Sequence, residues 1–316
     1  MSPNSWTCLH PSNATEAKLS LDNRGLAYGD GFFTTMGVID GQILWFDYHQ
    51  QRLVSHATAL QLQLDSQLLL AMLKIHAKQL QQGMLKLIIT RAEQEVRGYG
   101  YTPNIGGGSA CEIWLKSSPM AITTARSLPL ADGQFIPLQP AASAICLSSQ
   151  IACLPPTLAG LKSLNRLDNV LASGELQAIK AKTLAGTIKP SIAEGLLRDM
   201  SGQWVEGTMS NVFYQLVEAP VAKSSNRPHS QNNSSNYLTQ GQWYTPSMAQ
   251  SGVAGVMRQV IIDALANTER PVVMRSLHDE DLPRITRLFF CNALRGIMPM
   301  SSLRLLSGEV VSFEAI

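Results

Sequence analysis

The sequence has 316 residues, a formal net charge of +2 and 45% hydrophobic residues. This length is enough for two domains with large cores. The small net charge gives no strong field to attract nucleic acid or an anionic membrane, and no long apolar run or signal peptide is recognisable. We therefore expect a cytoplasmic protein that binds neither nucleic acid nor membrane.

The five cysteines are scattered through the chain, mostly in apolar segments, and show no paired spacing. An odd number of unpaired positions of this kind indicates reduced core thiols. A metal site would require cysteine or histidine pairs close in sequence, and the sequence has none, so no metal site is predicted.

The N-terminal third alternates between predicted strands and helices. A strand over 5–10 precedes a glycine-bearing turn that contains Tyr28, and a strand over 32–39 is followed by an Asp40-Gly41 hairpin turn and a partner strand over 42–46. Thr34 and Thr35 lie in the longer of these strands. The glycine-rich turn by itself indicates only ordinary turn chemistry.

Two helices follow. Asp47 is a suitable N-cap for the first, which carries Arg52, and the second runs over 66–82 and ends at Gly83. A buried strand over 84–90 then ends in Arg91, followed by Arg97 and Tyr99. Arginines and a tyrosine near a strand end suit a substrate carboxylate, and a solvated loop is an equally good interpretation.

The middle of the chain predicts a division between domains. After a strand over 111–116, the segment 117–130 is poor in apolar periodicity and is interpreted as a linker. We therefore expect a smaller domain over 1–120 and a larger one over 121–316. A polar stretch over 220–242 in the larger domain cannot bury much surface and is predicted to be a flexible insertion.

Lys162 lies after two prolines and a glycine and before an apolar run formed by Leu164, Leu167, Val170 and Leu171. This pattern predicts that Lys162 sits in the entry to a helix that runs to about 182, with the apolar run facing a core. A lysine held there is partly desolvated, which lowers its pKa and suits an amine that forms a Schiff base. Considered alone, it would be interpreted as a surface lysine.

Three later segments carry polar groups at the ends of elements. A hairpin over 193–205 leads to Glu206, which is followed by Asn211 at the start of the next strand. Gly252 to Arg258 open a helix whose first amides, at Val256 and Met257, would form an anion site. Strands at 272–274 and 288–291 follow, with Asn292 at the end of the second, and then a C-terminal hairpin over 303–313. A plain glycine-bearing helix start is an equally good interpretation of the anion site.

Mixed strands and helices with many antiparallel hairpins and few βαβ units predict an α+β fold. A lysine, a carboxylate, an arginine and free helix amides are together the groups that hold pyridoxal phosphate. With these segments, the sequence resembles the fold-type IV pyridoxal-phosphate enzymes, the class IV aminotransferase-like family. The resemblance extends from about Leu19 to Pro299 and rests on the segments Leu21–Arg24, Tyr28–Thr35, Leu161–Leu167 and Cys291–Leu294.

The resemblance implies an N-terminal domain, a larger barrel-like C-terminal domain like that of D-amino acid aminotransferase, and the cofactor between them. It implies that Lys162 carries the cofactor covalently and that Glu206 accepts a hydrogen bond from the protonated ring nitrogen. Arg52 is an implied cofactor contact, because with His49 it fits the family's His-x-x-Arg-Leu pattern. The other implied cofactor contacts are Asn211, Val256, Met257 and Asn292. Thr35 is the second candidate catalytic residue. The candidate substrate contacts are Tyr28, Arg91, Arg97 and Tyr99. The family also implies a homodimer.

Within the family the resemblance is greatest to the aminodeoxychorismate lyases, which make 4-aminobenzoate and pyruvate for folate synthesis and work with aminodeoxychorismate synthase. Met36-Gly37 departs from the Ala-Arg that such lyases often carry at this point. A transaminase of the same fold, acting on D-amino or branched-chain amino acids, is the alternative enzyme. A pyridoxal-phosphate-binding protein without catalytic activity is the alternative from another class.

Overall fold

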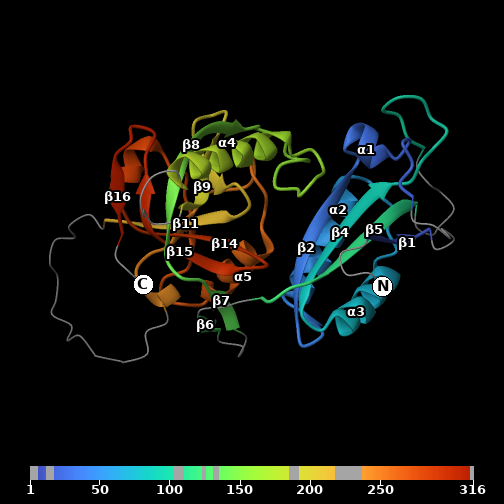
Figure 1. The fold of residues 1–316 in the computed structure, drawn as a ribbon, viewed down its shortest axis with the longest axis horizontal. Coiled ribbons are helices and arrows are strands. Elements are labelled where there is room, and N and C mark those ends of the chain that lie inside the picture. The colour runs from blue at the N-terminus through green and yellow to red at the C-terminus, as the bar shows by residue number, and fades with distance from the viewer. Residues whose placement is uncertain are drawn as a thin grey trace. The chain divides into compact units, whose positions relative to one another are not determined.

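The computed structural model describes residues 6–11, 18–102, 110–122, 126–130, 135–184, 192–217 and 237–313. It divides into two compact units: the first contains 1–123 and 155–167, and the second contains 124–154 and 168–316 (Figure 1). The predicted boundary at 120 lies close to this division. The segment that carries Lys162, however, belongs to the first unit, although it lies beyond that boundary in the sequence.

The first unit is built on a five-stranded antiparallel sheet in the order β1-β5-β4-β2-β3. The strands are β1 (Trp6–His10), β2 (Gly31–Ile39), β3 (Gln42–Ile43), β4 (Gly83–Arg91) and β5 (Cys111–Pro119). A short helix, α1 (Arg24–Tyr28), precedes β2, and α2 (Phe46–Ala59) and α3 (Ser66–Leu80) lie between β3 and β4.

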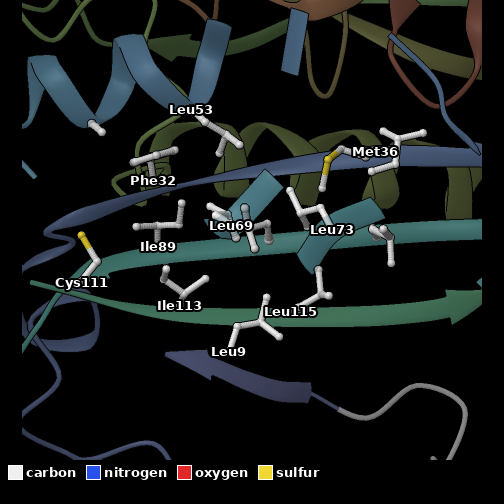
Figure 2. Packing of buried hydrophobic residues seen from close by; sticks show 14 of the residues in the cluster. Leu9, Phe32, Met36, Leu53, Leu69, Leu73, Ile89, Cys111, Ile113 and Leu115 are labelled. Carbon is white, nitrogen blue, oxygen red and sulfur yellow. The ribbon is translucent and has the colours of Figure 1, made fainter. Parts of the chain in front are cut away.

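One face of this sheet forms the core of the first unit. Alternate residues of β2, β4 and β5 point to one side because side chains alternate along a strand. Figure 2 shows these side chains packed against Leu53 from α2 and Leu69 and Leu73 from α3. Phe32 and Met36 supply the β2 part of this core and are fully buried. The residues between them, such as Phe33 and Thr35, therefore point to the opposite face.

The hairpin and helix predictions in this unit hold with one correction. Asp40 and Gly41 adopt positive φ values of 50° and 70°, as the predicted tight turn requires. Asp47 is not the N-cap of α2. Trp45 occupies that position with a φ of 57°, because β3 ends after two residues and the chain turns directly into the helix. Asp47 lies in the first turn, where its charge complements the helix dipole.

The second unit contains an eleven-stranded sheet, six strands of which close on themselves. Pairing runs from β8 (Ala142–Ile151) to β9 (Ile192–Asp199), β10 (Trp204–Gly207), β11 (Asn211–Leu216), β14 (Ile285–Asn292) and β15 (Gly296–Arg304), which pairs with β8 again. This closed ring is the barrel-like sheet that was predicted. The remaining elements are β6 (Arg126–Pro129), β7 (Phe135–Leu138), β12 (Tyr244–Thr245), β13 (Val273–Met274), β16 (Val310–Ser312), α4 (Leu167–Leu184), α5 (Val256–Leu265) and the 3₁₀ helices Tyr237–Thr239 and Asp279–Arg284.

The start of α4 differs from the prediction. The helix begins at Leu167, five residues after Lys162, and its buried face is formed by Ala172 and Leu176. Leu167 and Leu171 are 78% and 71% exposed, so the apolar run does not face a core within the described structure. The reason is that Ser163 bridges to Phe32 of β2, which keeps the lysine segment extended.

Two other sequence expectations concern the linker and the insertion. The segment 117–130 is not wholly irregular, because it contains the end of β5 and all of β6. Residues 218–236 of the predicted insertion lie outside the described residues. The end of that stretch is ordered by apolar contacts: Tyr237 and Leu238 are buried, and the Tyr237 ring packs edge-on against Trp243.

We predict that Leu73→Ala lowers the free energy of unfolding by about 2–5 kcal/mol, because Leu73 is fully buried in the core of the first unit. Leu68→Ala on the same helix is the matched control, since Leu68 is 56% exposed. Denaturant unfolding of both variants measures the difference. Equal losses in the two variants would contradict this assignment of the core.

Candidate active site

Both backbone polar groups of Lys162 are held within the first unit. Its N–H donates to His56 Nε2 at 2.9 Å, and its carbonyl accepts from the N–H of Phe33 at 3.0 Å. The N–H of Leu164 donates to the carbonyl of Gly31 at 3.0 Å, which adds a further tie to β2. The Nζ atom lies 4.5 Å from the centroid of the Phe33 ring. The amine therefore extends over an aromatic face from a backbone that is fixed on both sides.

The buried face of α2 carries three polar residues. His49, Arg52 and His56 are 1%, 7% and 5% exposed, and their spacing of three and four residues places them on one side of the helix. Arg52 Nη1 donates to Thr34 Oγ1 at 3.5 Å, and that oxygen lies 3.0 Å from His49 Nδ1. Burial lowers the pKa of Arg52 to about 10. Burial and the nearby Arg52 lower the pKa of both histidines to about 3, so the imidazoles are neutral near pH 7.

His56 was missed by the sequence analysis, although its spacing carried a signal. The run His49, Arg52, Leu53, His56 follows the period of a single helix face. Leu53 and Ala57 recur at helical spacing beside His56, so a helix that buries these two residues also places the histidine near its buried side. Its hydrogen bond to Lys162, which is 106 residues away in sequence, could not be read from the pattern.

Thr34 and Thr35 lie on opposite faces of the first sheet. Thr34 is fully buried beside His49 and Arg52, whereas Thr35 shares its face with Phe33, over which the Lys162 amine lies. Thr35 pairs in register with Lys86, whose Nζ lies 5.5 Å from the same Phe33 ring. Met36 and Gly37 stand where the lyases often carry Ala-Arg. Met36 points into the core, so on the face of Thr35 a glycine, Gly37, stands in place of the arginine.

The predicted substrate contacts cluster around Asp30. Its carboxylate accepts from the Nε atoms of both Arg24 and Arg91 at 2.9 Å. Arg91 also donates to the carbonyls of Leu60 and Gln61 at 2.7 and 3.0 Å, so its guanidinium ties Asp30 to the C-terminal end of α2. Arg24 donates to the carbonyl of Tyr99 at 3.2 Å.

The other candidates are exposed to solvent. The Tyr28 ring at the end of α1 and the Tyr99 ring meet edge to face at 5.3 Å, and Arg97, two residues before Tyr99, is exposed. Arg97, Tyr28 and Tyr99 are therefore placed where a carboxylate can reach them, whereas Arg91 is not.

The second unit gathers the remaining candidates at neighbouring strand ends. Glu206, Asn211 and Cys291 stand opposite one another on β10, β11 and β14. Asn292 follows Cys291 directly, and its Nδ2 donates to the carbonyl of Met209 at 3.5 Å. The sequence does not show this strand register. The register brings Glu206 and Asn292, which are 86 positions apart in the chain, to the same edge of the sheet.

Glu206 and Asn211 both hold Val253, in the turn before α5. The N–H of Val253 donates to Glu206 Oε2 at 2.8 Å, and its carbonyl accepts from Asn211 Nδ2 at 2.8 Å. A Cβ on Gly255 would lie 1.9 Å from Asn211 Oδ1, so any other residue there would displace the Asn211 side chain from its bond to Val253. Glu206 is 3% exposed, and Asn169 Nδ2 donates to its Oε1 at 3.4 Å.

The turn delivers the chain to the start of α5. Gly255 is the N-cap and provides no side-chain hydrogen bond, so the first-turn N–H groups, including those of Val256 and Met257, have no side-chain cap. These amides and the positive end of the helix dipole suit an anion. The buried carboxylate of Glu206 is thus hydrogen-bonded, through Val253, to the turn that leads into the predicted anion site.

A second buried glutamate supports the turn that follows Glu206. Glu194 on β9 accepts from the N–H and the hydroxyl of Thr208 at 3.0 and 2.6 Å, and from Ser210 Oγ at 2.6 Å. It also accepts from the N–H of Gly195 at 3.0 Å. Four donors stabilise its carboxylate at 4% exposure. Nothing in the sequence marks Glu194, because it lies in an ordinary strand pattern.

The described residues contain no group of histidine, cysteine, aspartate and glutamate arranged to hold a metal ion. No helix in the described ranges is long and apolar enough to span a membrane. Across these ranges, the predicted site residues form two sets. The first unit carries Lys162, Arg52, Thr35, Tyr28, Arg91, Arg97 and Tyr99, and the second carries Glu206, Asn211, Val256, Met257 and Asn292.

The fold has two units of mixed helices and strands. One carries an extended lysine, and the other carries a buried glutamate beside a helix start. Comparison with known proteins identifies the enzyme family. Residues 31–303 match the family model described as amino-transferase class IV, so the chain belongs to that family. Its fold is the fold-type IV architecture that the sequence predicted.

Individual relatives were found among both sequences and solved structures. Aminodeoxychorismate lyase of Vibrio harveyi is 23% identical over 289 residues, which cover 91% of this chain and 88% of that protein. The crystal structure of 4-amino-4-deoxychorismate lyase from Pseudomonas aeruginosa is 29% identical with a TM-score of 0.68, covering 94% of this chain and 90% of that one. The branched-chain amino acid aminotransferase of Escherichia coli is 19% identical with a TM-score of 0.63, covering 94% and 84%, and shares the fold.

We predict that the stability of the protein falls as the pH is lowered from about 6.5 towards 3, in part because His49 stays neutral in the folded state. The unfolded chain takes up a proton on this histidine below its usual pKa of 6.5, whereas the folded protein does so only near 3. His49→Gln should flatten the pH dependence of the unfolding free energy by up to about 1.4 kcal/mol per pH unit in this window.

Denaturant titrations at several pH values measure that slope. The half-buried His76, whose pKa is also lowered by burial, provides the comparison through His76→Gln, which should flatten the slope less. An unchanged slope in His49→Gln would contradict the buried neutral assignment.

We predict that Glu194→Gln destabilises the protein by about 1–3 kcal/mol, because the amide places a donor among groups that all donate. Glu175→Gln is the matched control. Glu175 likewise accepts from two serines, Ser148 and Ser149, but lies nearer the surface, where water can replace the lost bonds. Thermal unfolding compares the two. A loss at Glu175 equal to that at Glu194 would argue against the supporting role of the buried carboxylate.

Proposed function

We propose that the protein is a pyridoxal-phosphate-dependent aminodeoxychorismate lyase, which converts 4-amino-4-deoxychorismate to 4-aminobenzoate and pyruvate in folate synthesis. The observation that carries this proposal is Lys162, an amine on a backbone fixed at both its N–H and its carbonyl. The 29% identity to the Pseudomonas aeruginosa lyase over 94% of the chain supports the choice of reaction.

The residues present fit the cofactor chemically. Arg52 and the uncapped amides of Val256 and Met257 are cationic or donor groups for a phosphate. His49 Nε2 is buried and has no hydrogen-bond partner within the described ranges, which suits a neighbouring acceptor-rich group. Glu206 is a buried acceptor for a ring N–H.

When bound, pyridoxal phosphate supplies an aldehyde that condenses with amines and a cationic ring that accepts an electron pair. Lys162 would hold the cofactor in the resting enzyme and would accept the proton from the substrate carbon that bears the amine. Glu206 would accept a hydrogen bond from the protonated ring nitrogen and so keep the ring cationic. We assign to Thr35, which shares a face of the sheet with Phe33, the role of orienting the departing enolpyruvyl oxygen. Formation of the aromatic product makes the elimination strongly downhill, so the chain mainly supplies orientation.

For the substrate carboxylates we propose Arg97, Tyr28 and Tyr99, which are exposed to solvent. In this proposal Arg91 does not contact the substrate but holds Asp30 in place. We also propose that the enzyme is a cytoplasmic homodimer that receives its substrate from aminodeoxychorismate synthase.

A transaminase that acts on D-amino or branched-chain amino acids is the second candidate. Gly37 favours it, because this position carries no side chain for a second substrate carboxylate. Such an enzyme would use Lys162 and Glu206 in the same way. A cofactor-binding protein without activity would bind pyridoxal phosphate and turn over no amine.

We predict that the protein with aminodeoxychorismate synthase, chorismate and glutamine forms 4-aminobenzoate, and that Lys162→Ala lowers the rate by about 10²–10⁴-fold. Lys182→Ala, on the exposed side of α4, should retain activity. Incubation with D-alanine or leucine should leave the cofactor absorbance unchanged. Rapid bleaching by either amino acid without 4-aminobenzoate would instead establish the transaminase.

We predict that Glu206→Gln lowers the turnover number by about 10²–10³-fold while the protein still binds cofactor, because the amide loses the negative charge that holds the ring proton. The Gln oxygen can still accept from Val253, but the new amide faces the Nδ2 donor of Asn169, so the thermal stability of the cofactor-free protein should fall, though less than in Glu194→Gln, where four donors surround the carboxylate. Steady-state rates and thermal unfolding measure the two effects. Unchanged turnover would contradict the role assigned to Glu206.

A further inference from the structure

The hydrogen bond between Lys162 and His56 fixes the chemical state of the histidine. A backbone N–H can only donate, so His56 Nε2 must accept with its lone pair. The proton of the neutral ring is then on Nδ1, which lies 3.3 Å from Ser55 Oγ. Ser55 Oγ donates in turn to the carbonyl of Arg52 at 3.2 Å. The chain of bonds runs from the lysine backbone through the imidazole into α2.

The surroundings of His56 stabilise this neutral form. The ring is buried and packs edge-on against Phe32, with centroids 5.4 Å apart. Burial, and then the charges of Arg52, Lys162 and Arg166, lower the pKa of His56 to about 3. Protonation would place an N–H against the N–H of Lys162. His56 is therefore a hydrogen-bond acceptor over the whole working pH range and takes no part in proton transfer.

The bond also links two functional groups through one helix. Arg52 and His56 are one turn apart on α2, so the helix that carries the proposed phosphate cation also holds the backbone of the lysine. The carbonyl of Lys162 is held by β2 instead. Without the His56 contact, only the β2 side of the lysine backbone remains tied by these bonds, and the amine would start from a less defined position.

We propose that His56 is a positioning residue: as a permanently neutral acceptor, it fixes the backbone of Lys162 relative to Arg52 and so sets where the lysine amine meets the cofactor aldehyde. This inference rests on the proposed function for the role of the lysine. The hydrogen bond itself, and the tautomer that it requires, are independent of that function.

The test compares two substitutions of similar bulk. His56→Gln keeps an acceptor oxygen that can reach the lysine N–H, whereas His56→Leu removes the acceptor. His76→Leu on α3 is the matched control, since His76 is a partly buried histidine of the same unit. Each full-length protein is mixed with pyridoxal phosphate and reduced with borohydride at timed intervals, and the modified Lys162 peptide is quantified by mass spectrometry. The pH dependence of the cofactor absorbance is recorded in parallel.

In His56→Leu we expect modification of Lys162 to be at least about fivefold slower and the pH midpoint of the absorbance change to move. His56→Gln and His76→Leu should remain within about twofold of the wild-type rate. A purely structural role would lower the thermal stability of the Gln and Leu variants without moving the pH midpoint. A folded His56→Leu protein with wild-type rate and pH midpoint overturns the proposal.

Nitrogen-15 NMR of the cofactor-free protein keeps the proposal testable if His56→Leu does not fold. The His56 signals, assigned by their loss in His56→Gln, should show an unprotonated Nε2 and a protonated Nδ1 from pH 8 to pH 5. Titration of His56 near pH 6.5 overturns the proposal. If the wild-type protein gives no modified Lys162 while the NMR result holds, the proposed function fails and the His56–Lys162 bond stands.

Discussion

The site in the first unit depends on the fixation of one extended residue, Lys162, by two different elements. A catalytic amine on a long flexible side chain must start from a defined backbone position if it is to meet its target reproducibly. Here β2 holds the carbonyl of Lys162 and His56 of α2 holds its N–H. Because the same face of α2 carries Arg52, the geometry of the lysine is tied to that of a buried cation 110 residues earlier in the chain.

The second unit uses the same principle with different chemistry. Val253 is held at its N–H by Glu206 and at its carbonyl by Asn211, so a carboxylate and a carboxamide define the approach to α5. The turn after Glu206 is itself fastened to Glu194. In both units a polar side chain that is buried, and therefore costly to leave unpaired, orders a functional segment of backbone.

The sequence predicted the elements and the chemistry better than it predicted the places where segments meet. Hairpins such as the one at Asp40-Gly41 and the helix over 66–80 follow from local turn and periodicity signals. The predicted entry to α4 was wrong because the apolar spacing after Lys162 is helical, whereas Ser163 pairs with Phe32, a strand residue 131 positions earlier in the chain. Arg91 has the right chemistry for a carboxylate, but only the fold shows that Asp30 already engages it. The roles of His56 and Glu194 likewise depend on hydrogen-bond partners that are distant in sequence.

The most direct test of this account is a crystal structure of the protein grown with pyridoxal phosphate. We expect continuous density from Lys162 Nζ to the cofactor. A cofactor that is bound without a bond to Lys162 would contradict the account.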